Sequence, residues 1–252
     1  FPRAFNDWRF VLLVMIGSLA IFPDLGNATI LFLVALLMYS ISGIAHRWFA
    51  TILGVLTSLS FVSLTTIKLV GVDKFSKIPV FGYVAKRFSA FFNPFDDVAG
   101  AGHQLANSYY AMVNGGWFGL GLGNSIEKRG YLPEAHTDFV FSIVIEEFGF
   151  VGASLILALL FFLILRIILV GVRAKDPFNS MVAIGIGGMI LIQVFVNIGG
   201  ISGLIPSTGV TFPFLSQGGN SLLVLSVAIA FVLNIDASEK RAKLYSEYEA
   251  QL

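Results

Sequence analysis

Long apolar stretches without charged residues alternate with polar breaks along most of this 252-residue chain. A helix that crosses the hydrocarbon core of a bilayer needs about 20 mostly apolar residues. Several stretches reach or approach that length, and the first is short unless Phe5 and Trp8 extend it. The pattern predicts an all-α, polytopic membrane protein with about six transmembrane helices, over residues 10–22, 25–45, 48–67, 139–172, 178–198 and 221–235.

Residues 68–137 have a different pattern, because Lys, Asp, Gly and Pro recur and no window is long enough to cross a membrane. They predict one large extracellular loop. Two short amphipathic helices are predicted inside it, either packed against the protein or guiding a substrate. The first would lie in the headgroup region, with Val84, Phe88, Phe91 and Phe92 opposite Lys86 and Arg87. The second covers 103–113 and ends at Asn114-Gly115-Gly116.

The connection over residues 199–220 is rich in Gly, Ser and Pro and contains no charged residue. A solvated loop of this length would normally hold a few charges, so a re-entrant-like loop is predicted, folded against the membrane-embedded body. Irregular backbone at that depth needs protein or a water-filled cavity to satisfy its hydrogen bonds. Residues 236–252 are polar and predict a cytoplasmic tail, so the whole chain is interpreted as a single membrane domain.

Basic residues in the short loops predict the orientation, because such loops are positively charged on the cytoplasmic side. With six crossings they all fall on one side, namely Arg3, Arg9, Arg47, Arg173, Lys175, Lys240, Arg241 and Lys243. The large loop and the 199–220 connection then share the extracellular face.

The composition supports a membrane protein and reduces the range of expected binding partners. Hydrophobic residues make up 56% of the chain and charged residues 12%, against roughly 25% charged in an ordinary soluble domain. A net charge of +1 argues against a nucleic-acid partner, and the lack of cysteine excludes disulfides and thiol chemistry. The first residue is Phe rather than Met, so a fragment of a longer protein is expected.

Polar chemistry concentrates in residues 131–139, just before the fourth predicted span. Thr137 or His136 is expected to cap that helix, with Asp138 in its first turn. An acidic residue there is stabilised by the helix dipole, typically by ~0.3 to 1 kcal/mol. The position alone therefore leaves a structural and a catalytic role for Asp138 open.

Other polar positions also allow two interpretations. Glu146 and Glu147 are costly inside a span and need polar partners, either structural or functional. Lys128-Arg129 could bind a phosphate or form a solvated pair. The glycine-rich run 119–124 has no preceding strand, which favours a flexible turn over a nucleotide site. Ser216 lacks a Gly-x-Ser-x-Gly setting, which argues against a serine hydrolase.

Several ordered motifs together resemble those of the SEDS family, which includes FtsW, RodA and SpoVE. They are Pro23-Asp24-Leu25-Gly26, the run 119–125, the segment 132–139, Glu146-Glu147 with Gly149, Asn197-Ile198-Gly199 with 203–206, and 213–219. Ala135 before His136 is more similar to the FtsW branch, of a Gram-positive, streptococcus-like kind, than to RodA.

The resemblance implies a peptidoglycan glycosyltransferase that polymerises lipid II at the outer membrane face, usually with ten spans, of which this chain would supply the last six. It implies that Asp138 is the essential carboxylate, acting as the general base for the attacking sugar hydroxyl. Asp24 is a second candidate, or else an N-cap for the next span. The remaining predicted substrate contacts are Lys128, Arg129, Glu134, His136, Pro206, Ser216, Gly218 and Gly219.

The same resemblance implies a divalent cation, Mg or Mn, that helps the pyrophosphate leave, and no organic cofactor. The scattered His46, His103 and His136 show no metal-ligand spacing. The implied partners are a class B penicillin-binding protein transpeptidase and other divisome membrane proteins, in the plasma membrane at the division septum. A lipid II flippase and a non-catalytic division scaffold are the alternatives.

Overall fold

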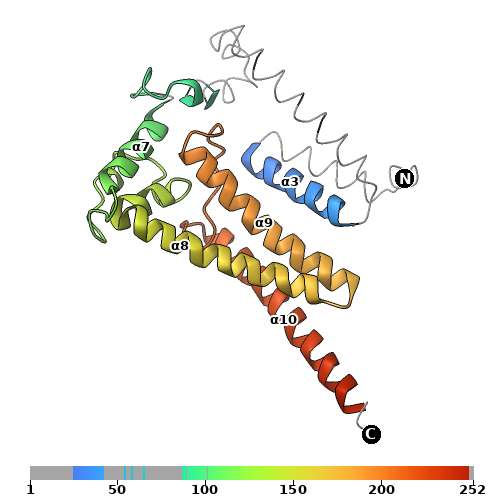
Figure 1. Ribbon diagram of the computed structural model, residues 1–252. Coiled ribbons are helices and arrows are strands. Elements are labelled where there is room, and N and C mark those ends of the chain that lie inside the picture. Colours follow the sequence, from blue (N-terminus) through green and yellow to red (C-terminus); the bar gives the residue numbers. More distant parts are fainter. Residues whose placement is uncertain are drawn as a thin grey trace.

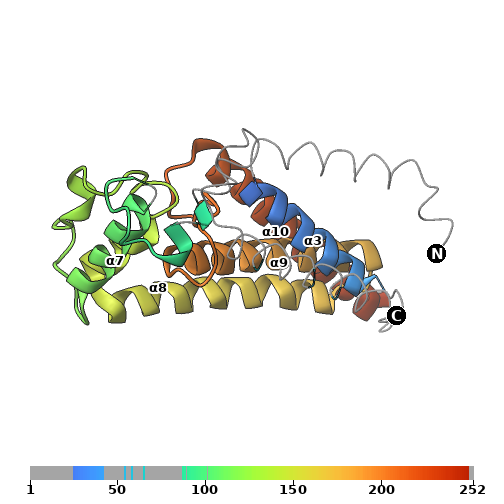
Figure 2. The same cartoon turned by 90° about the horizontal axis from the view of Figure 1, so that it is seen from above.

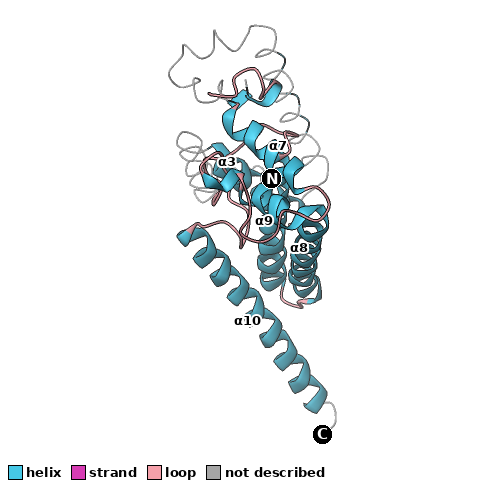
Figure 3. Ribbon diagram, turned by 90° about the vertical axis from the view of Figure 1, so that its left-hand side faces the viewer, coloured by secondary structure: helices cyan, strands magenta, loops and turns pink. Residues whose placement is uncertain are grey.

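The computed structural model describes residues 25–42, 54, 58, 65, 87–88, 90–100 and 102–249. This part contains helices and loops but no strand, which confirms the all-α fold class (Figure 3). Its elements are α3 (Leu25–Ile41), α7 (His103–Gly115), the 3-10 helix η1 (Glu127–Arg129), α8 (Val140–Arg173), α9 (Pro177–Ile201) and α10 (Gly219–Glu249).

Three described helices, α8, α9 and α10, are long and apolar enough to cross a membrane. They confirm the last three predicted spans. The shorter apolar helix α3, of 17 residues, covers most of the second. The first span, over 10–22, lies outside the described residues, as does the third, over 48–67, except that Gly54, Ser58 and Thr65 are helical. Of the predicted headgroup helix, residues 87–88 and 90–92 are described and helical.

Helices α8 and α9 run side by side and form the centre of the molecule, with α3 packed on α9 (Figures 1 and 2). Small residues on α9 allow this close packing, as is common between membrane helices. A Cβ on Gly188 would lie 2.0 Å from Leu37 Cδ2 of α3, and one on Gly187 would lie 2.7 Å from Ile168 Cγ1 of α8. A larger residue at either position would force these neighbouring side chains to shift.

The ladder of backbone hydrogen bonds in α8 is interrupted at Gly149, which has φ 70° and ψ −179°. In an unbroken helix the amides of Phe150 and Val151 would bond to the carbonyls of Glu146 and Glu147. Here all four groups bond to the 116–121 segment, which inserts into the gap. Phe150 N donates to Gly116 O (2.9 Å), Val151 N to Trp117 O (3.1 Å), Leu120 N to Glu146 O (2.9 Å) and Gly121 N to Glu147 O (2.9 Å).

The inserted segment explains the glycine-rich run. A Cβ on Gly149 would lie 2.4 Å from Gly119 N, and one on Gly119 would lie 2.2 Å from Glu147 O, so neither position has room for a side chain. Gly119, Gly121 and Gly123 all have positive φ. The run therefore forms a turn, as the sequence predicts. This turn inserts part of the large loop into the break in α8.

The break also accounts for the unusual length of α8, which has 34 residues. The 24 residues that follow Gly149 in α8 span about 36 Å at 1.5 Å per residue. That length is enough to cross a hydrocarbon core of about 30 Å without the residues that precede the break. Glu146 and Glu147 therefore lie beyond the segment needed for crossing, on the side of the large loop.

Glu146 is fully buried and holds the large loop against α8. Its carboxylate accepts hydrogen bonds from four donors in that loop, namely Ser125 Oγ, the backbone amides of Ile126 (3.1 Å) and Glu127 (3.3 Å), and Asn114 Nδ2 (3.2 Å). Glu147 pairs with Lys128 Nζ. Both glutamates therefore have structural roles, one of the two interpretations the sequence allows.

Beside Glu146, the carboxyl group of Glu127 is buried, and its Oε2 has no hydrogen-bond partner within the described structure. Burial, and then the negative charge of Glu146, raise the pKa of Glu127 above its ordinary value of 4.5, although His103 acts in the opposite direction. The folded state therefore favours protonated Glu127. Its contribution to stability is fully present below pH 4.5 and is lost as the pH rises through the raised pKa.

Glu127→Gln is expected to remove this loss, because the amide carries no ionisable proton. The variant should melt at a higher temperature than the wild type at neutral and alkaline pH, with the difference shrinking as the pH falls toward 4.5. Melting curves of the full-length protein in detergent across this pH range provide the measurement. Glu247→Gln, at an exposed position, is the control. A constant difference between Glu127→Gln and wild type at every pH would contradict the assignment.

At the other end of α8, Asp176 caps α9 by accepting from Asn179 N (3.1 Å), with Pro177 in the first helical position. Glu239 of α10 accepts from the backbone amide of Lys175 (3.2 Å) and so ties α10 to this turn. α10 continues without a break to Glu249. The residues predicted as a polar tail therefore extend the last span as helix.

Candidate active site

The 131–139 segment folds into a tight turn around the carbonyl of Glu134. This carbonyl accepts from the backbone amides of Thr137 (3.1 Å) and Phe139 (3.2 Å), and Glu134 itself has φ 57°. Leu132 and Phe139 are buried at either end of the turn. The two anchors and the shared carbonyl fix the backbone on which Asp138 sits.

The predicted capping of α8 is wrong. The N-cap residue is Phe139 and no side chain caps the helix, so Asp138 precedes the helix instead of lying in its first turn. Thr137 Oγ1 donates to the Glu134 carboxylate instead (2.6 Å), and the His136 side chain is exposed. The physical reason is that donors outside the helix bind the carbonyls that would otherwise start it.

Three consecutive carbonyls before α8 accept hydrogen bonds from α9 and from the loop that follows it. His136 O accepts from Gln217 N (2.8 Å), Thr137 O from Ser216 Oγ (2.6 Å) and Asp138 O from Asn197 Nδ2 (2.7 Å). Asn197 Nδ2 also donates to Val210 O (2.6 Å). The backbone of Asp138 is thereby held on a rigid frame, as a catalytic group requires.

The loop over residues 202–218 packs into the body of the protein. Val210, Phe212 and Pro213 are almost completely buried. Phe212 stacks on Phe141 of α8, with ring centroids 4.7 Å apart and an interplanar angle of 7°. α9 extends to Ile201, so the loop is shorter at its start than predicted.

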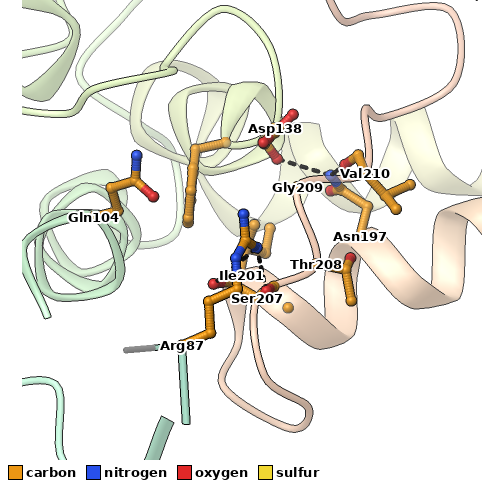
Figure 4. Close-up of a pocket in the computed structure, with 11 residues that line it drawn as sticks. Arg87, Gln104, Asp138, Asn197, Ile201, Ser207, Thr208, Gly209 and Val210 are labelled. Carbon is orange, nitrogen blue, oxygen red and sulfur yellow. Dashed lines mark hydrogen bonds between the residues drawn. The ribbon is translucent and has the colours of Figure 1, made fainter. Parts of the chain in front are cut away.

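Asp138 lines a small pocket between α7, α9 and the 202–218 loop (Figure 4). Arg87 faces the same pocket and donates through Nη1 to the carbonyl of Ser207. Both charged groups lie beside Gly209, because a Cβ added there would be 3.1 Å from Arg87 Nη2 and 3.4 Å from Asp138 Oδ2. The pocket therefore places a carboxylate and a guanidinium against the same glycine.

The free space in this pocket is about 10 Å³, which is room for about one water molecule. Asp138 itself is half-buried. A sugar would have to approach from the open side of Asp138, or else the 202–218 loop or the Arg87 segment would have to move. The arrangement can take a proton at Asp138 and stabilise negative charge at Arg87.

The oxygen ligands at the pocket are compatible with a divalent cation carried by a phosphate group. They include the Asp138 carboxylate and Asn197 Oδ1, a buried oxygen with no hydrogen-bond partner in the described structure. Mg²⁺ is usually bound by one or two carboxylates together with substrate phosphates rather than by an all-protein cage. The described residues contain no group of three or more His, Asp or Glu that could hold a metal ion by themselves.

The family described as cell cycle protein, which comprises FtsW, RodA and SpoVE, matches residues 2–241. The chain belongs to this family.

Individual relatives of this FtsW/RodA/SpoVE protein support the same family assignment. The probable peptidoglycan glycosyltransferases FtsW of Lactococcus lactis and Bacillus subtilis are 54% and 42% identical over 97% and 93% of the chain. Stage V sporulation protein E of Bacillus subtilis is 43% identical over 84% of it. The chain spans 58%, 56% and 54% of the length of these three relatives. The identities support an FtsW-like member of the family.

Solved structures share the fold. A chain from a study of structural coordination of polymerization and crosslinking by a peptidoglycan synthase complex superposes with a TM-score of 0.67 at 25% identity, covering 91% of this chain and 60% of that one. A mutant of the Thermus thermophilus rod shape determining protein RodA superposes with a TM-score of 0.55 at 23% identity, over 92% and 58% of the two chains. The fold is that of a polytopic helical membrane protein.

The other predicted substrate contacts of this family member that the structure describes do not line the Asp138 pocket. Lys128 is paired with Glu147, and the Ser216 hydroxyl accepts from Phe212 N (2.7 Å) as well as donating to Thr137 O. Arg129 is exposed. The backbone carbonyls of Glu134 and His136 accept hydrogen bonds that hold the 131–139 turn. Pro206 and Gly218 lie in the 202–218 loop, and Gly219 is the first residue of α10. Asp24 lies outside the described residues, and a substrate role for each of these positions stays a prediction.

Sequence reasoning missed Arg87, Gln104 and Asn197 as pocket residues. Arg87 was assigned only to the polar side of a surface helix, and Asn197 stood in a family motif without a role. A signal for Asn197 was available, since an amide side chain inside a mostly apolar span needs a polar partner. No local pattern pointed to Arg87 or Gln104, because their proximity to Asp138 depends on the tertiary fold.

Proposed function

We propose that the protein is a peptidoglycan glycosyltransferase that polymerises lipid II, with Asp138 as the general base. The single observation that supports this most strongly is that the Asp138 carboxylate and the Arg87 guanidinium both lie beside Gly209, with the backbone of Asp138 held by Asn197. The names of the FtsW relatives point to the same activity. A non-catalytic scaffold would not require a carboxylate beside a guanidinium, and the polymerisation assay below separates the enzyme from a flippase.

In the proposed reaction, a sugar hydroxyl attacks the anomeric carbon of a lipid-linked pyrophosphate sugar. A new glycosidic bond forms, the bond from the anomeric carbon to the pyrophosphate oxygen breaks, and the hydroxyl proton moves to Asp138. Arg87 would bind the departing pyrophosphate, since guanidinium groups match phosphate oxygens in a two-pronged arrangement. Asp138 and Asn197 Oδ1 could hold a divalent cation, Mg²⁺ or Mn²⁺, which would neutralise further charge on that leaving group.

The proposal places Asp138 on the extracellular side of the plasma membrane, in agreement with the orientation predicted from the basic residues. It assigns the protein to the division septum, with a class B penicillin-binding protein that crosslinks the new strands and with other divisome membrane proteins. The structural neighbour from a peptidoglycan synthase complex supports a transpeptidase partner.

Polymerisation of purified lipid II by the full-length protein, followed on gels that separate glycan strands by length, is the direct test of this function. Arg87→Ala is expected to lower the polymerisation rate by about 10- to 100-fold, because hydrogen bonds to charged groups contribute about 1.5–3 kcal/mol. Arg87→Lys should recover part of the rate, since lysine restores the positive charge but not the two parallel N–H donors of the guanidinium.

The control is Arg241→Ala, which removes an exposed guanidinium on α10 that does not line the pocket. An effect of Arg241→Ala as large as that of Arg87→Ala would contradict a specific role for Arg87. An absence of polymerisation by the full-length wild type, together with lipid II translocation in vesicles, would support the flippase instead.

A further inference from the structure

Two arginines lie on one face of α8, at the end of the helix away from Asp138. Arg166 and Arg173 are seven positions apart, which places them nearly two full turns and about 10 Å apart along the axis. Both side chains are exposed in the described structure. Arg166 falls within the apolar segment that follows Gly149, where a charged residue is costly without a partner or a polar cavity.

A cavity of about 120 Å³ lies between this face of α8 and α10. It is lined by both arginines and by Asp236, Glu239 and Lys240 of α10. Because one water molecule needs roughly 10–15 Å³ of such space, the cavity has room for several waters or for one phosphate group. It is separate from the Asp138 pocket, which lies at the opposite end of α8 (Figure 1).

The charges around the cavity leave an excess of hydrogen-bond donors. Asp236 is paired with Lys240 (2.6 Å), and Glu239 accepts from the backbone amides of Lys175 (3.2 Å) and Asp176 (3.5 Å). Neither arginine takes part in the three salt bridges of the described residues, of which one, between Lys240 and Asp236, lies at the cavity. Two guanidinium groups with five N–H donors each therefore face a space suited to an anion.

Apolar side chains continue from the cavity toward the middle of the span. Leu159 and Phe162 lie on the same face of α8 as Arg166, two turns and one turn nearer to Gly149, and are 63% and 61% exposed. On α10, Leu233 precedes Asp236 by one turn and is 63% exposed. A molecule with a charged head and an apolar tail matches this surface, whereas a free anion would use only the head site.

We propose that this cavity binds the phosphate headgroup of an anionic phospholipid, with its acyl chains along Leu159, Phe162 and Leu233. Arginine binds phosphate oxygens through two parallel hydrogen bonds, and basic pockets between membrane helices on the cytoplasmic side are suited to such headgroups. The bound lipid would hold α10 against α8. This binding is independent of the glycosyltransferase reaction.

Native mass spectrometry of the full-length protein released from nanodiscs tests the proposal. Nanodiscs of phosphatidylcholine with phosphatidylglycerol are compared with nanodiscs of phosphatidylcholine alone. The wild type is expected to retain phosphatidylglycerol, and the double variant Arg166→Gln with Arg173→Gln to retain it at least about tenfold less, as expected for the loss of two charge-assisted contacts. Arg241→Gln with Lys243→Gln is the matched control, because it removes the same charge from exposed positions on α10 outside the cavity.

Equal retention by the wild type and the arginine variant would overturn the proposal, and so would equal losses in the arginine variant and the control. If the double variant does not fold, Arg173→Gln alone, at the last residue of α8, is expected to show a partial loss under the same conditions. Displacement of the lipid by millimolar inorganic phosphate would reduce the cavity to a phosphate site and overturn the lipid assignment. Resistance to phosphate supports a lipid held by both its head and its chains.

Discussion

Asp138→Asn in the full-length protein is expected to lower the rate of lipid II polymerisation by about 10²- to 10⁴-fold, the usual contribution of general acid–base catalysis. The amide keeps the size of the side chain but cannot take a proton from the attacking hydroxyl. The hydrogen bond from Asn197 to the backbone carbonyl of residue 138 does not involve the side chain and should persist. The loss should therefore fall on the rate of chain extension, measured from glycan length over time.

Two controls make this result specific. Asp96→Asn changes an exposed carboxylate in the large loop and should leave the rate unchanged. The melting temperature and lipid II binding of the Asp138→Asn protein should remain near those of the wild type. A fully active Asp138→Asn protein would remove the general base from the proposed mechanism, and a loss confined to lipid translocation would favour the flippase.

Glu146→Leu is expected to lower the free energy of unfolding by about 2–6 kcal/mol, because two of its donors, Ser125 Oγ and Glu127 N, are fully buried and each costs about 1–3 kcal/mol without an acceptor. The four donors that lose their acceptor all belong to the segment of the large loop that lies against α8. Glu146→Gln keeps one acceptor oxygen and should lose less. Denaturant titration in detergent measures the total loss, and limited proteolysis should show early cleavage within 116–130.

Glu247→Leu provides the comparison, since Glu247 is 57% exposed and its contact with Lys243 is 3.7 Å long. Exposed pairs of this kind contribute about 0.3–0.5 kcal/mol. Similar stabilities of Glu146→Leu and Glu247→Leu would show that the buried carboxylate does not hold the loop.

The spans α8, α9 and α10 could be predicted from the sequence because hydropathy alone decides whether a segment can cross a bilayer. The break at Gly149 could not, since the apolar pattern continues on both sides of it. Its cause is the insertion of residues 116–121, which follow from the tertiary fold. The glycines of residues 119–124 predicted a turn, but they did not indicate that the turn would bind to α8.

Of the candidate site, the sequence predicted Asp138 but not the residues that surround it. Asp138 stands in a polar segment at the start of a span, and the family resemblance singles it out. Its capping role was predicted wrongly because the carbonyls of residues 136–138 bind donors from Asn197, Ser216 and Gln217, which lie far along the chain. Arg87 reaches the pocket through contacts with Ser207 in the loop that follows α9, which no periodicity reveals.

A structure of the full-length protein with lipid II and an acceptor strand bound would test the central claim most directly. The account predicts the attacking sugar hydroxyl within about 2.6–3.2 Å of an Asp138 carboxylate oxygen, the distance that proton transfer requires, with the pyrophosphate next to Arg87. A productive complex in which Asp138 contacts neither the hydroxyl nor the pyrophosphate would contradict it.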